Sequence, residues 1–329
     1  MIIGIDIGYS HVKGAVNSHV FSFPSVVGSP ETAAFSLSAD SRIALDTDHG
    51  LVQVGQAVLD QSRFISRPED RGWITSDEYK WLYLAALSES TTTFYSGNVT
   101  VITGLPIAYY RDDAETLRKV ILGSHPVQRE GRRAQTFVVA DCRVVPQPFG
   151  TLASVVFGPN GEPVDADMLK RPVGIVDIGG HTTNLLSMRK AQSIDRETGS
   201  VDMGAWDIVR AVKEYLATRT PGLSPEDYEI VEAIKARSIS YFGRDIDLSG
   251  AIEEALGHFR RQVLAEATHL WNHGADLYAI LVTGGGAHLI GDDLLTHFAE
   301  HERVRIVDRP VFANAVGYVR FGRYLEGLE

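Results

Sequence analysis

The sequence predicts an α/β protein built from two related halves. Its 329 residues, 44% of them hydrophobic and 22% charged, are enough to bury the cores of two domains. Short β-type runs alternate with segments of helical periodicity, which is typical of sheets flanked by helices. The opening pattern, an apolar run that ends in Asp-Ile-Gly, returns at residues 173–179. Such an internal repeat indicates two similar domains that face each other across a cleft.

The first half is expected to begin with a sheet. Residues 1–7, 11–16 and 20–23 are β-type runs around a Gly-Tyr-Ser turn. Residues 24–95 mix Ser, Asp, Pro and Gly with short strands and one helical segment at 76–87, and so predict a small inserted subdomain. We expect its aromatic residues to form its core rather than a subunit contact: Phe64, Trp73, Tyr79, Trp81 and Tyr83. The half continues with β runs at 99–103, 136–139 and 143–145 and helices at 112–121 and 149–156.

A stretch rich in Gly, Pro, Asn and Glu at residues 159–164 predicts a domain boundary. Domain I is then residues 1–158 and domain II residues 159–329. After the repeated motif we expect helices at 204–217 and 224–236, a hairpin at 238–247 with its turn at Gly243-Arg244, a long helix at 249–273 and a buried strand at 277–282. The amphipathic tail at 312–326 predicts a C-terminal helix that can pack back on domain I.

Composition argues against several classes of function. The chain has 31 Lys and Arg against 42 Asp and Glu, a formal charge of −11, so it offers no broad basic surface for direct binding of nucleic acid or anionic lipid. Cys142 is the only cysteine and lies in an apolar β-type stretch, where we expect a buried core residue and a reducing compartment. The sequence shows neither a secretion signal at its start nor an apolar run of membrane-spanning length, so we expect a cytoplasmic protein.

Two glycine turns carry the residues expected to bind phosphate. In Gly4–Lys13, Asp6 ends the strand, glycine lets backbone amides approach phosphate oxygens, and Lys13 can neutralise one of them. Gly174–Asn184 repeats the acid, at Asp177, the glycines and the hydroxyls. Either turn alone is also compatible with an ordinary β-turn, but two strand-end carboxylates suit a hydrated Mg²⁺ ion. The candidate phosphate-binding residues are Gly8, Tyr9, Ser10, Lys13, Gly179, Gly180, His181, Thr182 and Thr183.

A third glycine-rich segment follows the buried strand at 277–282. Gly284, Gly285 and Gly286 would let a flat base or ribose pass close to the backbone, although a flexible strand-to-helix turn also explains them. The segment is not a Rossmann fingerprint, because the third glycine of that pattern would fall at Leu289. The chain has no Gly-Lys-Ser/Thr ending either, which excludes a standard P-loop.

Together with Val311–Tyr318, these motifs resemble those of the actin-like ParM/StbA plasmid-segregation ATPases, in the same order along nearly the whole chain. The resemblance implies an actin-like fold of two RNase H-like domains around a nucleotide cleft, with ATP or GTP and Mg²⁺ held by the two phosphate loops. It also implies self-association into filaments and attachment to a plasmid through a DNA-binding adaptor protein.

The resemblance assigns roles to further residues. Thr103–Pro106 and Val145–Gly150 resemble family segments, and Gln147 stands where actin-like proteins carry the residue that orients the attacking water. Without the resemblance, its position between two prolines would indicate an exposed turn residue. The implied catalytic residues are therefore Gln147, Asp6 and Asp177, the two acids binding Mg²⁺ through water. Gly204, Glu232 and Lys235 are implied at the adenosine, with a surface ion pair as the competing explanation for the last two. The chain departs from the family pattern at His11, His181 and Asn184, the last standing where many relatives have a carboxylate.

Two other functions stay open. A small-molecule kinase of the same superfamily needs a carboxylate base to take a proton from its substrate. Gln147 favours hydrolysis over transfer, while Asp141 lies near enough in sequence to keep the kinase possible. The second alternative is a nucleotide-binding scaffold with little turnover, in which His181 and Asn184 would be signs of lost chemistry.

Overall fold

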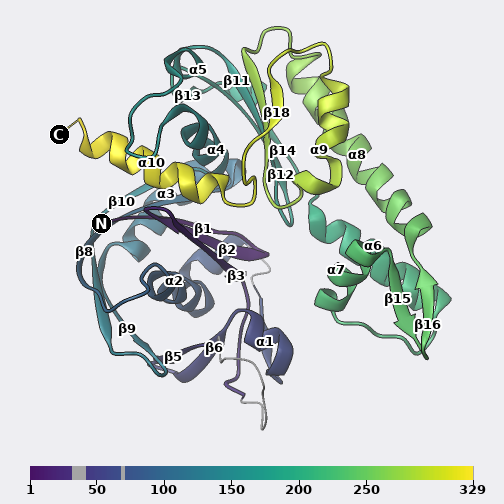
Figure 1. Ribbon diagram of the computed structural model, residues 1–329, viewed down its shortest axis with the longest axis horizontal. Coiled ribbons are helices and arrows are strands. Elements are labelled where there is room, and N and C mark those ends of the chain that lie inside the picture. Colours follow the sequence, from purple (N-terminus) through teal and green to yellow (C-terminus); the bar gives the residue numbers. More distant parts are fainter. Residues whose placement is uncertain (32–41, 68–70, 329) are drawn as a thin grey trace. The chain divides into compact units, whose positions relative to one another are not determined.

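In the computed structural model, which describes residues 1–31, 42–67 and 71–328, the chain folds as two units (Figure 1). Unit 1 comprises Met1–Lys170 and Val307–Glu329, and unit 2 comprises Arg171–Ile306. The stretch at 159–164 lies inside unit 1, where an added Cβ on Gly161 would meet the Tyr324 backbone nitrogen at 2.3 Å. It packs against the C-terminal helix and therefore does not act as a linker.

Unit 1 contains one long sheet with helices packed against it. Its strands run in the order β3-β2-β1-β8-β10-β9-β5-β6-β4-β7. They are β1 Ile2–Ile7, β2 His11–Val16, β3 His19–Pro24, β4 Val27–Gly28, β5 Ile43–Thr47, β6 Gly50–Val54, β7 Ile65–Ser66, β8 Ser96–Leu105, β9 Gly123–Arg129 and β10 Gln135–Pro146. The helices are α1 Gln56–Gln61, the 3₁₀ helix η1 Arg71–Thr75, α2 Asp77–Glu89, α3 Ile107–Ile121, α4 Gln147–Val156, α5 Ala166–Lys170 and α10 Ala313–Glu326.

Unit 2 is built on a smaller sheet in the order β13-β12-β11-β17-β18, with β14 paired to β12. The strands are β11 Val173–Ile178, β12 Thr183–Arg189, β13 Gln192–Ser193, β14 Gly199–Val201, β17 Ala279–Thr283 and β18 Val304–Ile306, and a separate hairpin is formed by β15 Ser238–Tyr241 and β16 Arg244–Asp247. The helices are the 3₁₀ helix η2 Asp195–Glu197, α6 Ala205–Arg219, α7 Asp227–Ala236, α8 Ser249–Trp271 and α9 Ala287–His297.

The two units repeat the same five-strand pattern. In unit 1, β3, β2 and β1 are antiparallel neighbours and β8 and β10 continue the sheet in parallel; in unit 2, β13, β12, β11, β17 and β18 follow the same order and directions. The internal repeat read from the sequence is thus present in the fold, and the predicted α/β class with helix-flanked sheets is confirmed.

The described parts of residues 24–95 join the main sheet. Their strand β5 pairs with β9, Leu45 opposite Arg129, and one apolar core extends under both parts. The helix expected at 76–87 is α2, whose N-cap Ser76 accepts a hydrogen bond from the Tyr79 backbone. The segment expected to be a small subdomain is therefore a continuation of the larger sheet.

The aromatic residues of this segment are mostly core residues, as expected. Trp73, Tyr79 and Tyr83 are buried, and Trp81 packs partly buried against them. The expectation is wrong for Phe64, which is 78% exposed and directly precedes β7, the last strand in the order of the sheet. Cys142 is buried as expected, and burial raises the pKa of its thiol to about 12.

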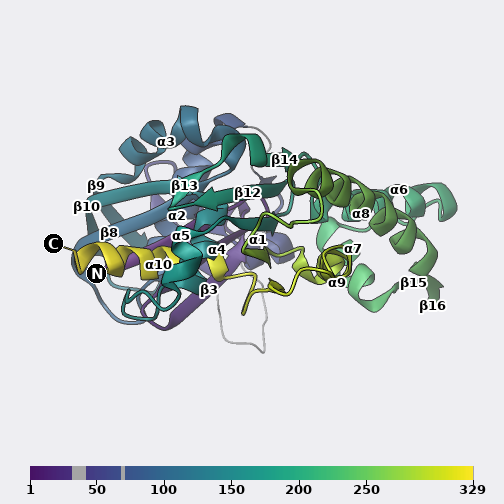
Figure 2. The ribbon, with the colours of Figure 1, turned by 90° about the horizontal axis from the view of Figure 1, so that it is seen from above.

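Helix α10 lies along α4 in both ribbon views (Figures 1 and 2). The two helices touch at Gly150 and Gly317, where an added Cβ on Gly317 would lie 1.7 Å from the Gly150 carbonyl oxygen. Beside this crossing, Thr151 donates a hydrogen bond of 2.8 Å to the Asn314 side chain. Two residues of the Val311–Tyr318 motif, Asn314 and Gly317, thus lie at the contact between α10 and α4.

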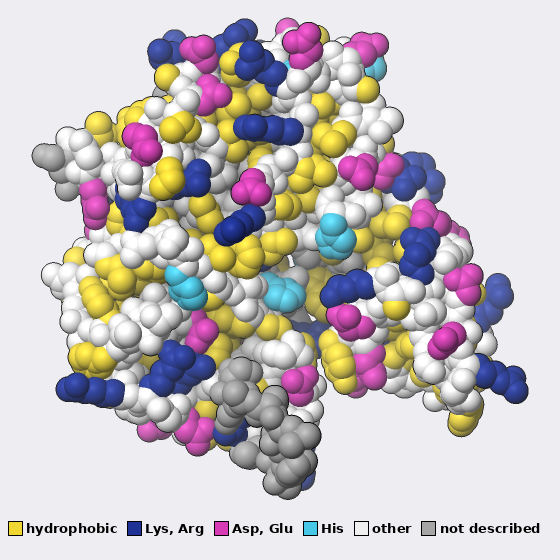
Figure 3. All heavy atoms as spheres, in the orientation of Figure 1, with side chains coloured by type: hydrophobic (Ala, Val, Ile, Leu, Met, Phe, Trp, Pro, Cys, Tyr) yellow, Lys and Arg dark blue, Asp and Glu magenta, His cyan; other side chains and the backbone are white. Residues whose placement is uncertain are grey.

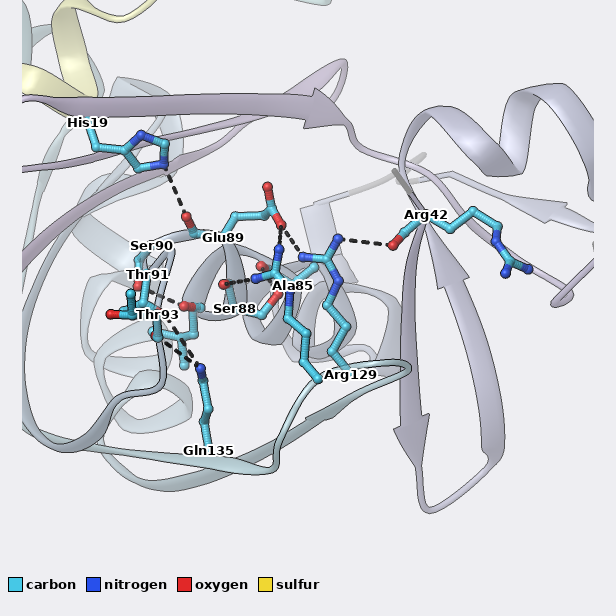
Figure 4. A network of polar contacts seen from close by, with 12 residues as sticks. His19, Arg42, Ala85, Ser88, Glu89, Ser90, Thr91, Thr93, Arg129 and Gln135 are labelled. Carbon is cyan, nitrogen blue, oxygen red and sulfur yellow. Dashed lines mark hydrogen bonds and ion pairs between the residues drawn. The ribbon is translucent and has the colours of Figure 1, made fainter. Parts of the chain in front are cut away.

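A network of charged residues fastens the end of α2 to the sheet (Figure 4). The Glu89 carboxylate binds the guanidinium of Arg129, whose side chain is 9% exposed, and Arg129 also donates to the Arg42 carbonyl at 3.0 Å. Arg132 lies 3.8 Å from the same carboxylate and donates to the Ser88 carbonyl at 3.3 Å. The network therefore connects α2 with β9 and with the residue before β5.

Most predicted elements of unit 2 are present. The hairpin turn is Phe242-Gly243 rather than Gly243-Arg244, and both of its residues have positive φ, as a type I′ turn requires.

Among the described residues, none of the helices combines the length and the apolar composition needed to cross a bilayer. On the face drawn in Figure 3, acidic and basic side chains are interspersed rather than sorted by sign.

We expect His125 to make the stability of unit 1 depend on pH. Its Nε2 lies 2.7 Å from the Ile121 carbonyl and its ring meets Tyr83 edge-on, and burial lowers its pKa from the ordinary 6.5, despite the opposing effect of that carbonyl. Because the unfolded chain takes up the proton first, the stabilising contribution of neutral His125 is present above pH 6.5 and lost as the pH falls below it.

The measurement is the free energy of urea unfolding of the wild type and of His125→Gln between about pH 7.5 and about pH 5.5. The wild type should lose stability relative to the variant as the pH falls. A difference that stays constant over this range would contradict the assignment.

Candidate functional site

The first glycine turn, which we call loop 1 (Gly8–His11), connects β1 and β2. Asp6 and Lys13 are directly opposite in the antiparallel register, and the turn is closed by a 3.2 Å hydrogen bond from the Gly8 N–H to the His11 carbonyl. The Asp6 residue is only 4% exposed, and its Oδ2 lies 3.7 Å from the Lys13 Nζ. A buried carboxylate thus stands beside a cation at the end of the central strand.

Gln147 lies in the same place. It is the first residue of α4, partly buried, and its Nε2 donates a 3.0 Å hydrogen bond to Asp6 Oδ1. Tyr318 of α10, itself fully buried, donates to the Gln147 carbonyl at 3.3 Å. The exposed-turn explanation for Gln147 does not hold, because a helix start and two hydrogen bonds fix the residue beside Asp6.

The second turn, loop 2 (Gly179–Thr182), reproduces the geometry of loop 1 between β11 and β12. Asp177 pairs with Asn184 in the register position that Asp6 and Lys13 occupy in unit 1, and Gly179 N–H donates to the Thr182 carbonyl at 2.9 Å. Asp177 is 6% exposed and Asn184 3%. The two halves therefore present the same carboxylate at the same strand end, one opposite a lysine and the other opposite an asparagine.

The third glycine segment lies against Asp177. Gly284 has φ 93°, and an added Cβ would be 2.3 Å from the Ile178 carbonyl oxygen and 2.5 Å from the Asp177 carboxylate. The N–H of Gly286 donates to the same Ile178 carbonyl at 2.9 Å. An added Cβ on Gly285 meets no atom within 4 Å, so that position is open for a ligand to approach.

Gly204 is needed where helix α6 meets loop 2. An added Cβ on Gly204 would lie 2.3 Å from the Gly180 carbonyl oxygen. Beyond it, the N–H groups of Ala205 and Trp206 donate to the Gly179 and Gly180 carbonyls at 3.1 and 2.8 Å. Gly204 was expected near the adenosine, and the packing provides a second reason for a glycine there.

Several candidate residues make contacts within their own unit. The Tyr9 ring stacks on Trp73 at 5.5 Å, and Thr183 donates to the Met203 carbonyl at 2.9 Å. The Ser10 carbonyl accepts a hydrogen bond from the Ser25 N–H. Thr182 and His181 are partly exposed. Burial lowers the pKa of His181, against the opposing effect of Asp207. On α7, Glu232 and Lys235 form an exposed ion pair of 2.6 Å, as the competing explanation expected.

Asp141 does not lie beside Asp6. Asp141 pairs with Thr100 of β8, and Thr100 pairs with Ile2 at the start of β1, whereas Asp6 is the last but one residue of β1. Four residues of strand separate the two levels by about 13 Å. Asp141 is exposed and pairs with Arg143 at 3.2 Å, so the fold gives the kinase alternative no support from this residue.

The donor set suits a magnesium ion held through water. In the part of the chain that the structure describes, no three His, Cys, Asp or Glu residues gather as direct metal ligands. Asp6 in unit 1 and Asp177 in unit 2 are each a buried carboxylate, and Mg²⁺ commonly keeps several waters and takes one or two carboxylates. Each strand end by itself therefore offers a carboxylate that suits the waters of a hydrated ion.

One contribution was missed from the sequence. Ser25, which is 1% exposed, donates through its hydroxyl to the Gly8 carbonyl at 2.6 Å. Nothing local to Ser25 indicated this role. The Thr103-Gly104 pair near the end of β8 resembles Thr283-Gly284 at the end of β17, but Thr103 is level with Ile5 whereas Thr283 is level with Asp177, so the two pairs differ by one residue in register.

Comparison with known proteins gives two matching family models and many similar structures. Residues 4–150 match the actin-like proteins N-terminal domain, and residues 175–296 match the C-terminal domain of the archaeal actin homologue MreB-like proteins. A search of curated protein sequences gave no significant match.

Three of the similar structures cover nearly the whole chain. A ParM from a 15-stranded filament of Clostridium botulinum is 20% identical with a TM-score of 0.83, covering 98% of each chain. A non-polymerisable quadruple mutant of pCBH ParM is 19% identical, with the same TM-score of 0.83 and 98% of each chain covered. An archaeal actin homologue in complex with ADP is 18% identical with a TM-score of 0.79, covering 100% of this chain and 99% of its own.

Proposed function

Because the chain belongs to the actin-like proteins, we propose that it is an ATPase that binds a magnesium nucleotide, ATP or GTP, through loops 1 and 2 and assembles into filaments. The observation that carries this proposal is the repeated strand end. Asp6 and Asp177 occupy equivalent register positions, and each is followed by a glycine turn closed by the same hydrogen bond. One such turn is common in proteins, but two copies in equivalent places are what a pair of phosphate loops requires.

The proposed roles follow from the chemistry of each group. The loop amides and Lys13 bind phosphate oxygens, and the buried Asp6 and Asp177 accept hydrogen bonds from the waters of Mg²⁺. The bound Mg²⁺ supplies neutralisation of the phosphate charge. Gln147 has a neutral amide, which is too weak a base to take a proton, so it orients the attacking water. Its present hydrogen bond to Asp6 holds the amide at the site beforehand.

Filament assembly is supported by the Clostridium botulinum relative, whose structure is a filament. ADP binding by the archaeal actin homologue supports the nucleotide. By the same family reasoning, the filament would act in the cytoplasm to move or segregate plasmid DNA. The contact with DNA would be made by an adaptor protein rather than by this acidic chain.

The test follows light scattering and phosphate release together after purified protein is mixed with Mg²⁺ and ATP, and separately with GTP. Scattering should rise with nucleotide and decay as phosphate appears. Gln147→Ala should slow phosphate release by about 100-fold, the size of the effect of losing one positioned polar group, and prolong the scattering plateau. Asp177→Ala should weaken both signals.

Gln262→Ala, at an exposed position of α8, is the matched control and should behave as the wild type. A flat scattering trace despite tight nucleotide binding would overturn the filament. If phosphate release were also absent, the scaffold alternative would replace the ATPase. Transfer of phosphate to an added small alcohol in place of water would instead support the kinase.

A further inference from the structure

Both loops have their carbonyl groups bound on one side by the protein. In loop 1, the Ser25 hydroxyl donates to the Gly8 carbonyl at 2.6 Å, and the Ser25 N–H donates to the Ser10 carbonyl at 2.9 Å. In loop 2, the first two N–H groups of α6 bind the carbonyls of Gly179 and Gly180. The two units thus reach one arrangement by different means: a buried serine in unit 1 and a helix N-terminus in unit 2.

This arrangement fixes the direction of the loop amides. A trans peptide is planar, and its N–H points away from its carbonyl. The peptides whose carbonyls face Ser25 therefore direct the N–H groups of Tyr9 and His11 to the opposite side. Anions are bound by N–H groups and repelled by carbonyl oxygens, so the peptide direction decides whether loop 1 can receive a phosphate.

The backbone of loop 1 is not held in this conformation by its own residues alone. Glycine has no Cβ and therefore adopts many backbone conformations. The peptide bond after Gly8 has little intrinsic preference for the direction in which its carbonyl and N–H point. Tyr9 lies in the chain between Gly8 and Ser10, the two residues whose carbonyls are bound. Its ring stacks on Trp73, and Trp73 in turn meets Tyr79 edge-on at 5.0 Å. Ser25 and Trp73 both come from residues 24–95, so that segment supports loop 1 at two points.

We infer that Ser25 is a positioning residue, which holds the loop 1 peptides with their N–H groups directed toward the nucleotide phosphate without contacting the nucleotide. This inference rests on the proposed nucleotide function. It explains why a serine that is 1% exposed has both its hydroxyl and its N–H bound to a single turn.

The experiment compares Ser25→Ala with Ser88→Ala. Ser88 is also buried in unit 1, at 2% exposed, and its hydroxyl donates to the Ala85 carbonyl at 2.8 Å, away from loop 1. Titration calorimetry with Mg-ADP and Mg-GDP measures nucleotide affinity, and urea unfolding measures stability. Ser25→Ala should bind about tenfold more weakly than the wild type, the equivalent of one hydrogen bond to a charged group, while Ser88→Ala keeps the wild-type affinity.

Hydrogen exchange in the protein without nucleotide provides the second readout. The Tyr9 and His11 amides should change their exchange rate in Ser25→Ala and keep it in Ser88→Ala. Unchanged exchange, or a loss of affinity no larger than that of Ser88→Ala, would overturn the role of Ser25. A wild type that binds no nucleotide would instead overturn the proposed function, whatever the exchange rates show.

Discussion

Replacing Gly317 by alanine should destabilise unit 1 by about 3 kcal/mol or more, the upper range for forcing an extra group into a packed interior. The added Cβ would lie 1.7 Å from the Gly150 carbonyl oxygen, and backbone cannot move aside as a side chain can. In an exposed helix the same change is stabilising by roughly 0.5–1 kcal/mol, because alanine favours the helix more than glycine does. A steric clash with Gly150 and a gain in helix propensity therefore predict changes of opposite sign. Urea unfolding of the nucleotide-free protein measures the effect.

Gly327→Ala is the control on the same helix. It stands at the C-cap with φ −76°, and its added Cβ would have its nearest neighbours at 3.5 Å, an ordinary contact. Its stability should change by less than about 1 kcal/mol. An unfolding midpoint of Gly317→Ala equal to that of the wild type would contradict the prediction. It would mean that α10 can move away from α4 without a loss of stability.

Replacing Glu89 by glutamine should cost about 3 kcal/mol of stability, because it leaves the Arg129 cation buried without its carboxylate. The Arg129 side chain is only 9% exposed, and Glu89 is 26% exposed. The change keeps the size of the side chain, so the loss measures charge rather than packing. Thermal and urea unfolding of the two proteins give the difference.

Glu232→Gln supplies the matched comparison, since it removes the same charge from the Lys235 ion pair, whose side chains are 70% and 61% exposed. That variant should lose less than about 0.5 kcal/mol, as exposed pairs do. Adding Arg129→Met to Glu89→Gln should restore much of the lost stability, because the unpaired cation is then gone. Equal losses in Glu89→Gln and Glu232→Gln would contradict the buried network.

Local features of the chain were sufficient to predict much of the candidate site. A strand needs only an apolar run, and a turn needs only glycine beside it, so the Asp6 and Asp177 strand ends could be read directly. Gln147 was different: its own neighbours indicated a turn, and only the resemblance to actin-like proteins selected it. Its hydrogen bond joins residues 141 positions apart, a distance over which sequence pattern carries no information.

The sequence by itself determined the two related halves, their glycine turns and the carboxylates at the strand ends, because period, polarity and glycine act over a few residues. Only the tertiary structure decided that the described parts of residues 24–95 extend the main sheet, that Ser25 binds loop 1, and that Gly317 touches Gly150. Those results depend on which surfaces meet after the chain has folded. Burial and hydrogen bonding between distant segments select them, and no local pattern records that choice.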